Sequence, residues 1–225
     1  MKYSAIAPSK MSVNDLRNLV RVGEGKYLEF KREISSPEKI AREISAFANT
    51  SGGKLIIGVD DDKTLRGIGS FYEQDFLLEK AFHDFCRPVP EYTLEIVRYK
   101  DREIAIVTVM EAKRKPIYVK DGKRRDAYIR MKDKSVKASP EMKDLMRKVS
   151  SGKDVTFEYG PTEQKLFRYL NEYQRITVAE FARFIDLPEK QARHILVNLT
   201  AAEILKLFNN EQGDYFCFAE STASN

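Results

Sequence analysis

The sequence is poor in the residues that disulfide frameworks and zinc sites require. Its 225 residues include two cysteines, Cys86 and Cys217, and two histidines, His83 and His194, without any Cys-x-x-Cys pair. The cysteines lie far apart in apolar surroundings, which predicts buried free thiols and no disulfide framework. A zinc site is disfavoured because structural zinc sites draw their ligands from clustered cysteines and histidines.

Long apolar stretches are also missing. No apolar run approaches the ~20 residues of a membrane-spanning helix, and the first ten residues lack the apolar core of a signal peptide. We therefore expect a cytoplasmic protein with no membrane partner. The composition, 42% hydrophobic and 32% charged, is typical of a globular protein, and the length suffices for two modest domains.

Positive charge is present, but it is concentrated in one segment. The chain carries a net charge of +5, whereas residues 113–137 contain eleven Lys or Arg against three Asp, a net +8 that leaves −3 for the other 200 residues. A local excess of positive charge is what a surface that binds a polyanion requires. A solvated lysine-rich loop is the alternative, but the strands expected on both sides favour nucleic-acid contact.

The hydrophobic pattern predicts an α+β domain over residues 1–149, with a mostly antiparallel sheet and helices packed on it. Capping residues predict helices that begin after Ser12 and Ser36, and a third helix over 74–86. The expected strands form a set of short apolar or alternating runs. They are residues 27–31, 55–59 with 65–68 pairing back on it, and two hairpins over 92–110 and 117–131.

A second, smaller domain follows. A helix capped by Ser139 should end the first domain near Val149, and residues 150–160 have the composition of a linker. Residues 161–220 then predict three helices and a two-stranded hairpin, the order of a winged helix-turn-helix. We expect residues 221–225 to form a disordered tail.

The most distinctive stretch is residues 46–61, AFANTSGGKLIIGVDD, preceded by Glu24 and Glu29-Phe30-Lys31 and followed by Gly67. In this order the blocks resemble the AlbA-2 domain, the nucleic-acid-binding unit of Schlafen proteins and of many bacterial transcriptional regulators. Residues 127–131 and 138–141 continue the likeness, which covers about two thirds of the chain. The resemblance implies a nucleic-acid-binding protein, with DNA favoured over RNA.

The acidic residues of these blocks suggest a second function. Schlafen relatives cleave structured RNA with three carboxylates, and the resemblance assigns that catalytic and metal-binding role to Glu24, Glu29 and Asp60 or Asp61. Such a site would hold Mg²⁺ or Mn²⁺, which prefer oxygen ligands and activate water. Local roles remain open, since Glu29 can pair with Lys31 and Asp60 can cap the turn after its strand. No other cofactor is expected.

The candidate contacts to nucleic acid fall in two groups. In the first domain they are Lys31, Lys113, Arg114, Lys115, Lys123, Arg124, Arg125, Arg130, Lys132 and Lys134. On the solvent side of the third helix of the second domain they are Lys190, Gln191, Arg193, His194 and Asn198. A nearly neutral winged helix also suits dimerisation or protein docking, and that alternative stays open.

The leading hypothesis is therefore a DNA-binding transcriptional regulator, with a metal-dependent endoribonuclease as the alternative. A homodimer is expected, because Schlafen cores carry two copies of the module and this chain carries one. ATP binding is the third possibility. Residues 49–54, NTSGGK, lack the spacing of a phosphate-binding loop and precede their strand, so ATP hydrolysis is disfavoured.

Overall fold

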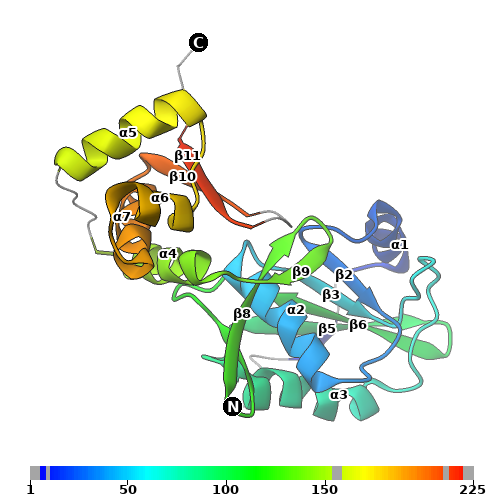
Figure 1. The fold of residues 1–225 in the computed structure, drawn as a ribbon. Coiled ribbons are helices and arrows are strands. Elements are labelled where there is room, and N and C mark those ends of the chain that lie inside the picture. The colour runs from blue at the N-terminus through cyan, green and yellow to red at the C-terminus, as the bar shows by residue number, and fades with distance from the viewer. Residues whose placement is uncertain (1–5, 9–10, 154–158, 210–212, 220–225) are drawn as a thin grey trace. The chain divides into compact units, whose positions relative to one another are not determined.

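The computed structural model describes residues 6–8, 11–153, 159–209 and 213–219 (Figure 1). Residues 154–158 of the predicted linker 150–160 and all of the predicted tail 221–225 lie outside the described residues. The chain divides into two compact units, Met1–Ala138 and Ser139–Asn225. Within the described ranges, no helix combines the length and the apolar character needed to cross a bilayer.

The first unit contains two sheets. The five-stranded sheet has the order β1 (Ile6–Pro8), β5 (Tyr92–Tyr99), β6 (Arg102–Val109), β3 (Gly53–Ile57) and β2 (Leu28–Lys31). The four-stranded sheet has the order β4 (Cys86–Arg87), β7 (Tyr118–Asp121), β8 (Arg124–Met131) and β9 (Lys134–Lys137). The second sheet is antiparallel throughout, whereas β1 with β5 and β2 with β3 are parallel. The α+β prediction is thus confirmed, with a mixed central sheet.

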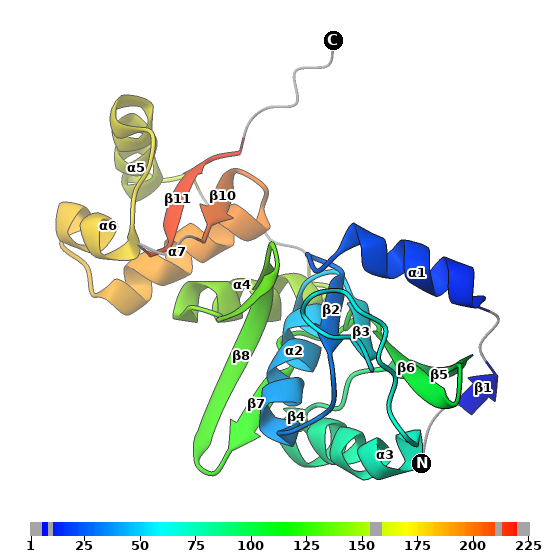
Figure 2. The same ribbon diagram turned by 90° about the vertical axis from the view of Figure 1, so that its right-hand side faces the viewer.

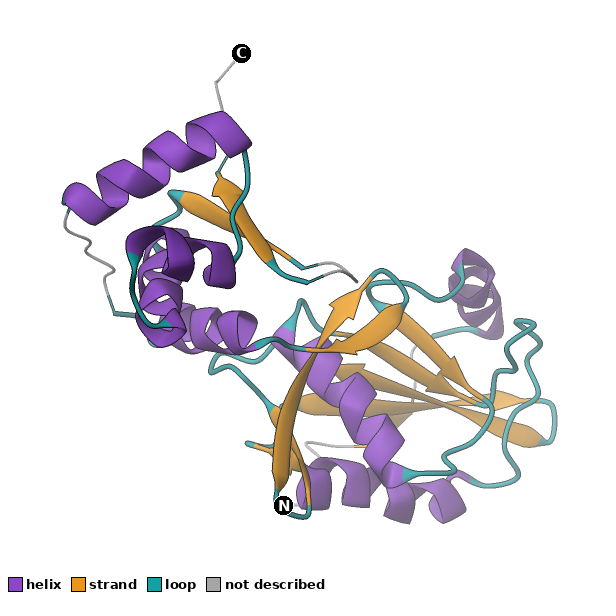
Figure 3. Cartoon of the chain, in the orientation of Figure 1, coloured by secondary structure: helices purple, strands orange, loops and turns teal. Residues whose placement is uncertain are grey.

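Side-chain alternation along β3 explains how helices cover both faces of the five-stranded sheet (Figure 3). Leu55 and Ile57 belong to the core cluster that includes the apolar face of α2 (Pro37–Asn49). Ile56 points to the opposite face and packs in a cluster with α1 (Val13–Val22). Because successive strand residues face opposite sides, the continuous apolar run 55–57 of β3 indicates a sheet buried on both faces.

The predicted helix starts are confirmed by their capping geometry. Ser12 and Asp15 form a capping box at the start of α1, and the Ser36 hydroxyl accepts a hydrogen bond at the start of α2. The glycine pair after α2 is required by the backbone. Gly52 has a φ of +70°, and a Cβ at this position would lie 2.9 Å from the carbonyl oxygen of Val109.

Two predictions about local structure were wrong in detail, and three short strands were missed. The helix expected over 74–86 begins earlier, as α3 (Phe71–Lys80), and continues as one π-helical turn, η1 (Ala81–Phe85). Residues 65–68 form only isolated bridges, Val59 with Leu65 and Ile68 with Glu103. Strands β1, β4 and β9 were not predicted, because two to four residues are too few to show a periodic pattern.

Helix α2 lies beside strand β8 of the second sheet (Figure 1), and Asn49 and Ser45, both buried on α2, connect the two. The Asn49 amide donates to the carbonyl oxygens of Ile117 and Tyr128, each at 2.9 Å, and its oxygen accepts from the Ile117 N–H at 2.7 Å. The Ser45 hydroxyl donates to the Ile117 carbonyl at 2.8 Å and accepts from the Tyr128 N–H at 3.1 Å. These side chains satisfy backbone groups that would otherwise be buried without partners.

The second unit consists of helices and one small sheet. Its elements are α4 (Pro140–Ser150), α5 (Pro161–Tyr173), α6 (Val178–Ile185), α7 (Glu189–Ala201), β10 (Leu205–Phe208) and β11 (Tyr215–Phe218). Leu166, Phe181, Leu196 and Phe216 lie in its core. The prediction that the helix after Ser139 ends the first domain is corrected: α4 belongs to the second unit and packs against α7.

Replacing Asn49 with alanine should lower the free energy of unfolding by about 3 kcal/mol, because buried backbone groups of residues 117 and 128 lose their partners. Urea denaturation followed by circular dichroism measures this change. Asn18→Ala on the exposed side of α1 is the matched control and should stay within about 0.5 kcal/mol of wild type. Equal stabilities of the two variants would refute the role given to Asn49.

Candidate nucleic-acid interface

The exposed end of the β7–β8 hairpin carries four of the eleven cations of the basic segment. Antiparallel pairing places Lys120 opposite Arg125 and Asp121 opposite Arg124, with Lys123 in the connecting turn. All five side chains are exposed. Figure 2 shows this turn at the far end of a long hairpin, away from the five-stranded sheet. We name Lys120, Lys123, Arg124 and Arg125 the hairpin tip.

Lys120 and the aromatic ring of Tyr118 were missing from the candidates that the sequence predicted. Lys120 joins the hairpin tip through its register opposite Arg125, and the guanidinium of Arg125 lies 4.8 Å from the ring centre of Tyr118. An arginine stacked on an aromatic ring keeps its charge while its orientation is restricted. The turn signal Asp121-Gly122 would have given this register from sequence, had the strands been paired residue by residue.

The rest of the basic segment does not join the hairpin tip. Lys132 and Lys134 lie in and after the turn at the opposite end of β8, and Lys113 and Arg114 lie exposed in the connection before β7. Lys115 is half-buried, and its ammonium group lies 2.6 Å from Glu111 and 3.0 Å from the Thr50 carbonyl oxygen. The predicted single basic face is therefore divided among three places of the first unit.

Arg130 was predicted to contact nucleic acid, and the structure corrects this prediction. Its side chain is fully buried, with an exposed fraction of 0%. Nη1 lies 3.0 Å from Glu29 Oε2 and 2.8 Å from Glu43 Oε2, and it donates to the Ser135 hydroxyl at 3.1 Å. Nη2 donates to the carbonyl oxygen of Gly25 at 2.7 Å. A guanidinium enclosed in this way cannot reach a phosphate backbone.

The same cluster accounts for Glu29 and Lys31. Glu29 is buried between the Arg130 guanidinium and the Lys31 ammonium group, both of which form ion pairs with it. Burial raises the pKa of the neighbouring Glu43 carboxyl; Glu29 adds to the effect, and the Ser135 hydroxyl and Arg130 oppose it. The folded chain thus holds this proton to a higher pH than the unfolded chain, so the stability that Glu43 contributes falls as the pH rises.

The three carboxylates predicted for a metal site have separate partners. Glu24 accepts a hydrogen bond from the Phe30 N–H at 2.9 Å, Glu29 belongs to the Arg130 cluster, and Asp60 lies 2.7 Å from Arg66 Nε. Asp61 is exposed. Across the described part of the chain, no three His, Cys, Asp or Glu side chains are grouped so that they could hold a metal ion. The segments are neighbours, since β2 pairs with β3, but the carboxylates do not converge.

On α7 the predicted solvent-side residues have unequal environments. Lys190, Gln191 and His194 are exposed and Asn198 is half-buried. These four residues line a pocket whose other wall comes from α4. Arg193 is not free for base contacts, because its Nε lies 2.9 Å from Glu141 Oε1 of α4. The expectation that Arg193 faces solvent is therefore corrected.

Replacing Arg130 with methionine should lower the free energy of unfolding by about 3–5 kcal/mol, because Glu29 and Glu43 would remain buried without their shared cation. Arg125→Met removes an exposed arginine from the same strand and should cost under about 1 kcal/mol. Denaturation with urea compares the two variants. Equal losses would show that the Arg130 cluster does not stabilise the first unit.

Comparisons with known proteins show which family the sequence of the first unit matches. The family described as Schlafen, AlbA_2 matches residues 24–139, just over half of the chain. No curated protein matches. Among solved structures, the N-terminal domain of a RecG-related protein from Nitrosomonas europaea is 25% identical over 53% of this chain and 88% of its own, with a TM-score of 0.41.

A second solved structure, the DIP2311 protein from Corynebacterium diphtheriae, is 18% identical with a TM-score of 0.46. It aligns with 96% of this chain, which spans 36% of the length of that protein. The family match extends from Glu24 through the glycine pair and the basic hairpin to Ser139, so it contains both sheets' central strands. The chain belongs to the Schlafen AlbA_2 family.

Proposed function

We propose that this protein binds nucleic acid through the hairpin tip and acts as a DNA-binding transcriptional regulator. The observation that carries the proposal is the group of four exposed cations, Lys120, Lys123, Arg124 and Arg125, against one acid, Asp121, at the end of a hairpin. A cluster of this kind neutralises successive phosphates and releases their counterions. Membership in the Schlafen AlbA_2 family supports the proposal, because the resemblance links that family to nucleic acid.

The base of the hairpin supports a binding role as well. Strands β7 and β8 are fixed to α2 by the hydrogen bonds of Ser45 and Asn49, whereas their exposed ends extend beyond this contact (Figure 2). Cations at the end of a fixed element can approach a phosphate backbone without unfolding any of the core. Phosphate contacts of this kind give affinity but carry no sequence information.

The regulator role rests on the second unit. Helices α5, α6 and α7 followed by the β10–β11 hairpin have the order of a winged helix. We propose this assignment, with two copies of the chain forming a homodimer. Light scattering of the purified full chain tests the dimer, and a monomer mass at micromolar concentration would exclude it.

Replacing Arg124 and Arg125 together with alanine should weaken binding to a 30-base-pair duplex regardless of its sequence. If both arginines contact phosphates, the plot of log affinity against log salt should flatten by about 1.8, since each phosphate contact contributes about 0.9. Fluorescence anisotropy across a salt series measures both quantities, and a single-stranded RNA of equal length tests the preference for DNA.

The matched control is Lys39→Ala with Arg98→Ala, which removes the same charge from exposed positions on α2 and β5. This control should keep the wild-type affinity and salt dependence. If it weakens binding as much as the tip variant does, net charge and not the hairpin tip determines affinity. If the tip variant binds like wild type, the proposed interface is wrong.

A further inference from the structure

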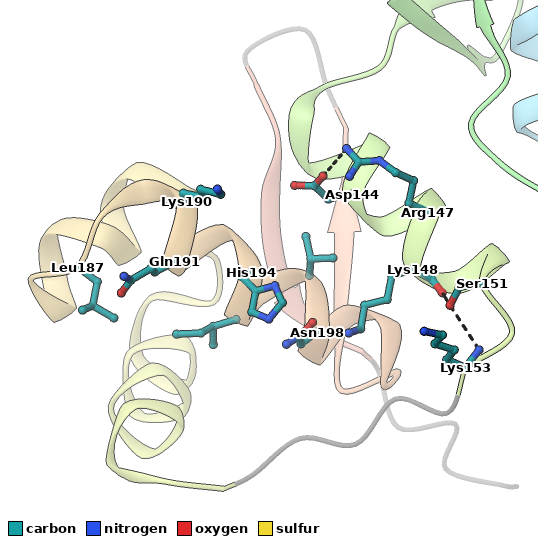
Figure 4. Close-up of a pocket in the computed structure, with 12 residues that line it drawn as sticks. Asp144, Arg147, Lys148, Ser151, Lys153, Leu187, Lys190, Gln191, His194 and Asn198 are labelled. Carbon is teal, nitrogen blue, oxygen red and sulfur yellow. Dashed lines mark hydrogen bonds and ion pairs between the residues drawn. The ribbon is translucent and has the colours of Figure 1, made fainter. Parts of the chain in front are cut away.

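A pocket of the second unit lies between α4 and α7 and has a volume of about 930 Å³. Figure 4 shows Gln191, His194 and Asn198 along one wall and Lys148 and Lys153 on the opposite side. The pocket therefore uses the face of α7 that the sequence predicted for base contacts. Its volume lies within the range of about 300–1,000 Å³ that is usual for small-molecule sites.

The charged residues of this pocket are mostly cations. Lys148, Lys153 and Lys190 line it, and none of the three forms an ion pair within the described part of the chain. Asp144, its one acidic residue, is already paired with Arg147 at 2.6 Å. The lining consequently has an excess of positive charge that no described side chain neutralises, and a bound anion would gain charge-assisted hydrogen bonds.

The remaining surface is largely apolar. Leu187, Ile195 and Val197 line the pocket together with the aliphatic stems of the lysines. Small-molecule sites commonly combine apolar walls with a few polar groups that orient the ligand. A purely inorganic ion would leave these walls exposed to water, so the lining favours a ligand that has both an apolar body and an anionic group.

We propose that the α4–α7 pocket binds a small organic anion, with its apolar body against Leu187, Ile195 and Val197 and its carboxylate, sulfonate or phosphate held by the pocket lysines. The proposal concerns the second unit and is independent of the nucleic-acid function proposed for the hairpin tip. A DNA duplex is a poorer fit. Two packed helices span about 20 Å, from axes about 8–10 Å apart and diameters of about 10 Å, whereas the major groove is about 12 Å wide.

The probe is 8-anilinonaphthalene-1-sulfonate, which joins an aromatic body to one sulfonate, and N-phenyl-1-naphthylamine is its neutral counterpart. Titration of the full chain, followed by fluorescence, should show the sulfonate binding about tenfold or more tightly than the neutral compound, because only the sulfonate can use the lysines. Lys148→Glu and Lys190→Glu should each weaken sulfonate binding severalfold. Lys165→Glu, exposed on α5 outside the pocket, should leave it unchanged.

The two histidines of the chain can show where the probe binds. His194 lines the pocket, whereas His83 lies on η1 in the first unit. In proton NMR spectra the ring signals of His194, assigned with His194→Gln, should shift on addition of the sulfonate while those of His83 stay in place. Circular dichroism checks that each variant is folded.

Three results would overturn the proposal. They are equal affinity for the charged and neutral probes, sulfonate binding that Lys148→Glu and Lys190→Glu leave intact in folded protein, and displacement of the sulfonate by duplex DNA in direct competition. The last result would assign the pocket to nucleic acid. Loss of DNA binding in the hairpin-tip variant alone would leave the proposal unaffected, because that variant alters the other unit.

Discussion

The buried guanidinium of Arg130 is the contact on which the first unit depends. It joins Glu29 on β2, Glu43 on α2 and Ser135 on β9, and it lies 4.8 Å from the ring centre of Phe47. One arginine thus links both sheets to the helix between them. An ion pair of this kind adds little net stability compared with an apolar cluster, but removal of one charge leaves the others buried without compensation. The cluster therefore favours one arrangement of these elements over alternatives that would leave a charge unpaired.

This cluster also shows where sequence reasoning reached its limit. Helix caps and the long hairpins depend on neighbouring residues, so the helix starts after Ser12 and Ser36 were predicted correctly. The burial of Arg130 depends on contacts with Glu43, Glu29 and Gly25, which lie 87, 101 and 105 positions away in the chain. The residues next to an arginine in a basic segment do not indicate whether its side chain is buried or exposed. For the same reason Glu29 could be assigned to a metal site or to an ion pair, and only the packing decided between them.

The buried and the exposed cations of the basic segment have different roles. Arg130 and Lys115 form ion pairs and hydrogen bonds within the fold, whereas the cations of the hairpin tip are exposed. Strand β8 carries both kinds of arginine within eight residues. Its core-facing end fixes the strand, and its other end presents Arg124 and Arg125 to solvent. A local charge excess in sequence therefore overstates the charge that is available to a partner.

In the second unit, packing likewise limits which side chains are available to a partner. A helix enters a major groove with one exposed face, and on α7 the face with Lys190, Gln191 and His194 lines the pocket shared with α4. Arg193 is held by Glu141 of that same helix. Base readout by this face would require α4 to leave, at the cost of the ion pair and the packing between the two helices. With α4 in place, this face of α7 is better suited to bind a small ligand than a duplex, and the first unit has the exposed cations that contact with a phosphate backbone needs.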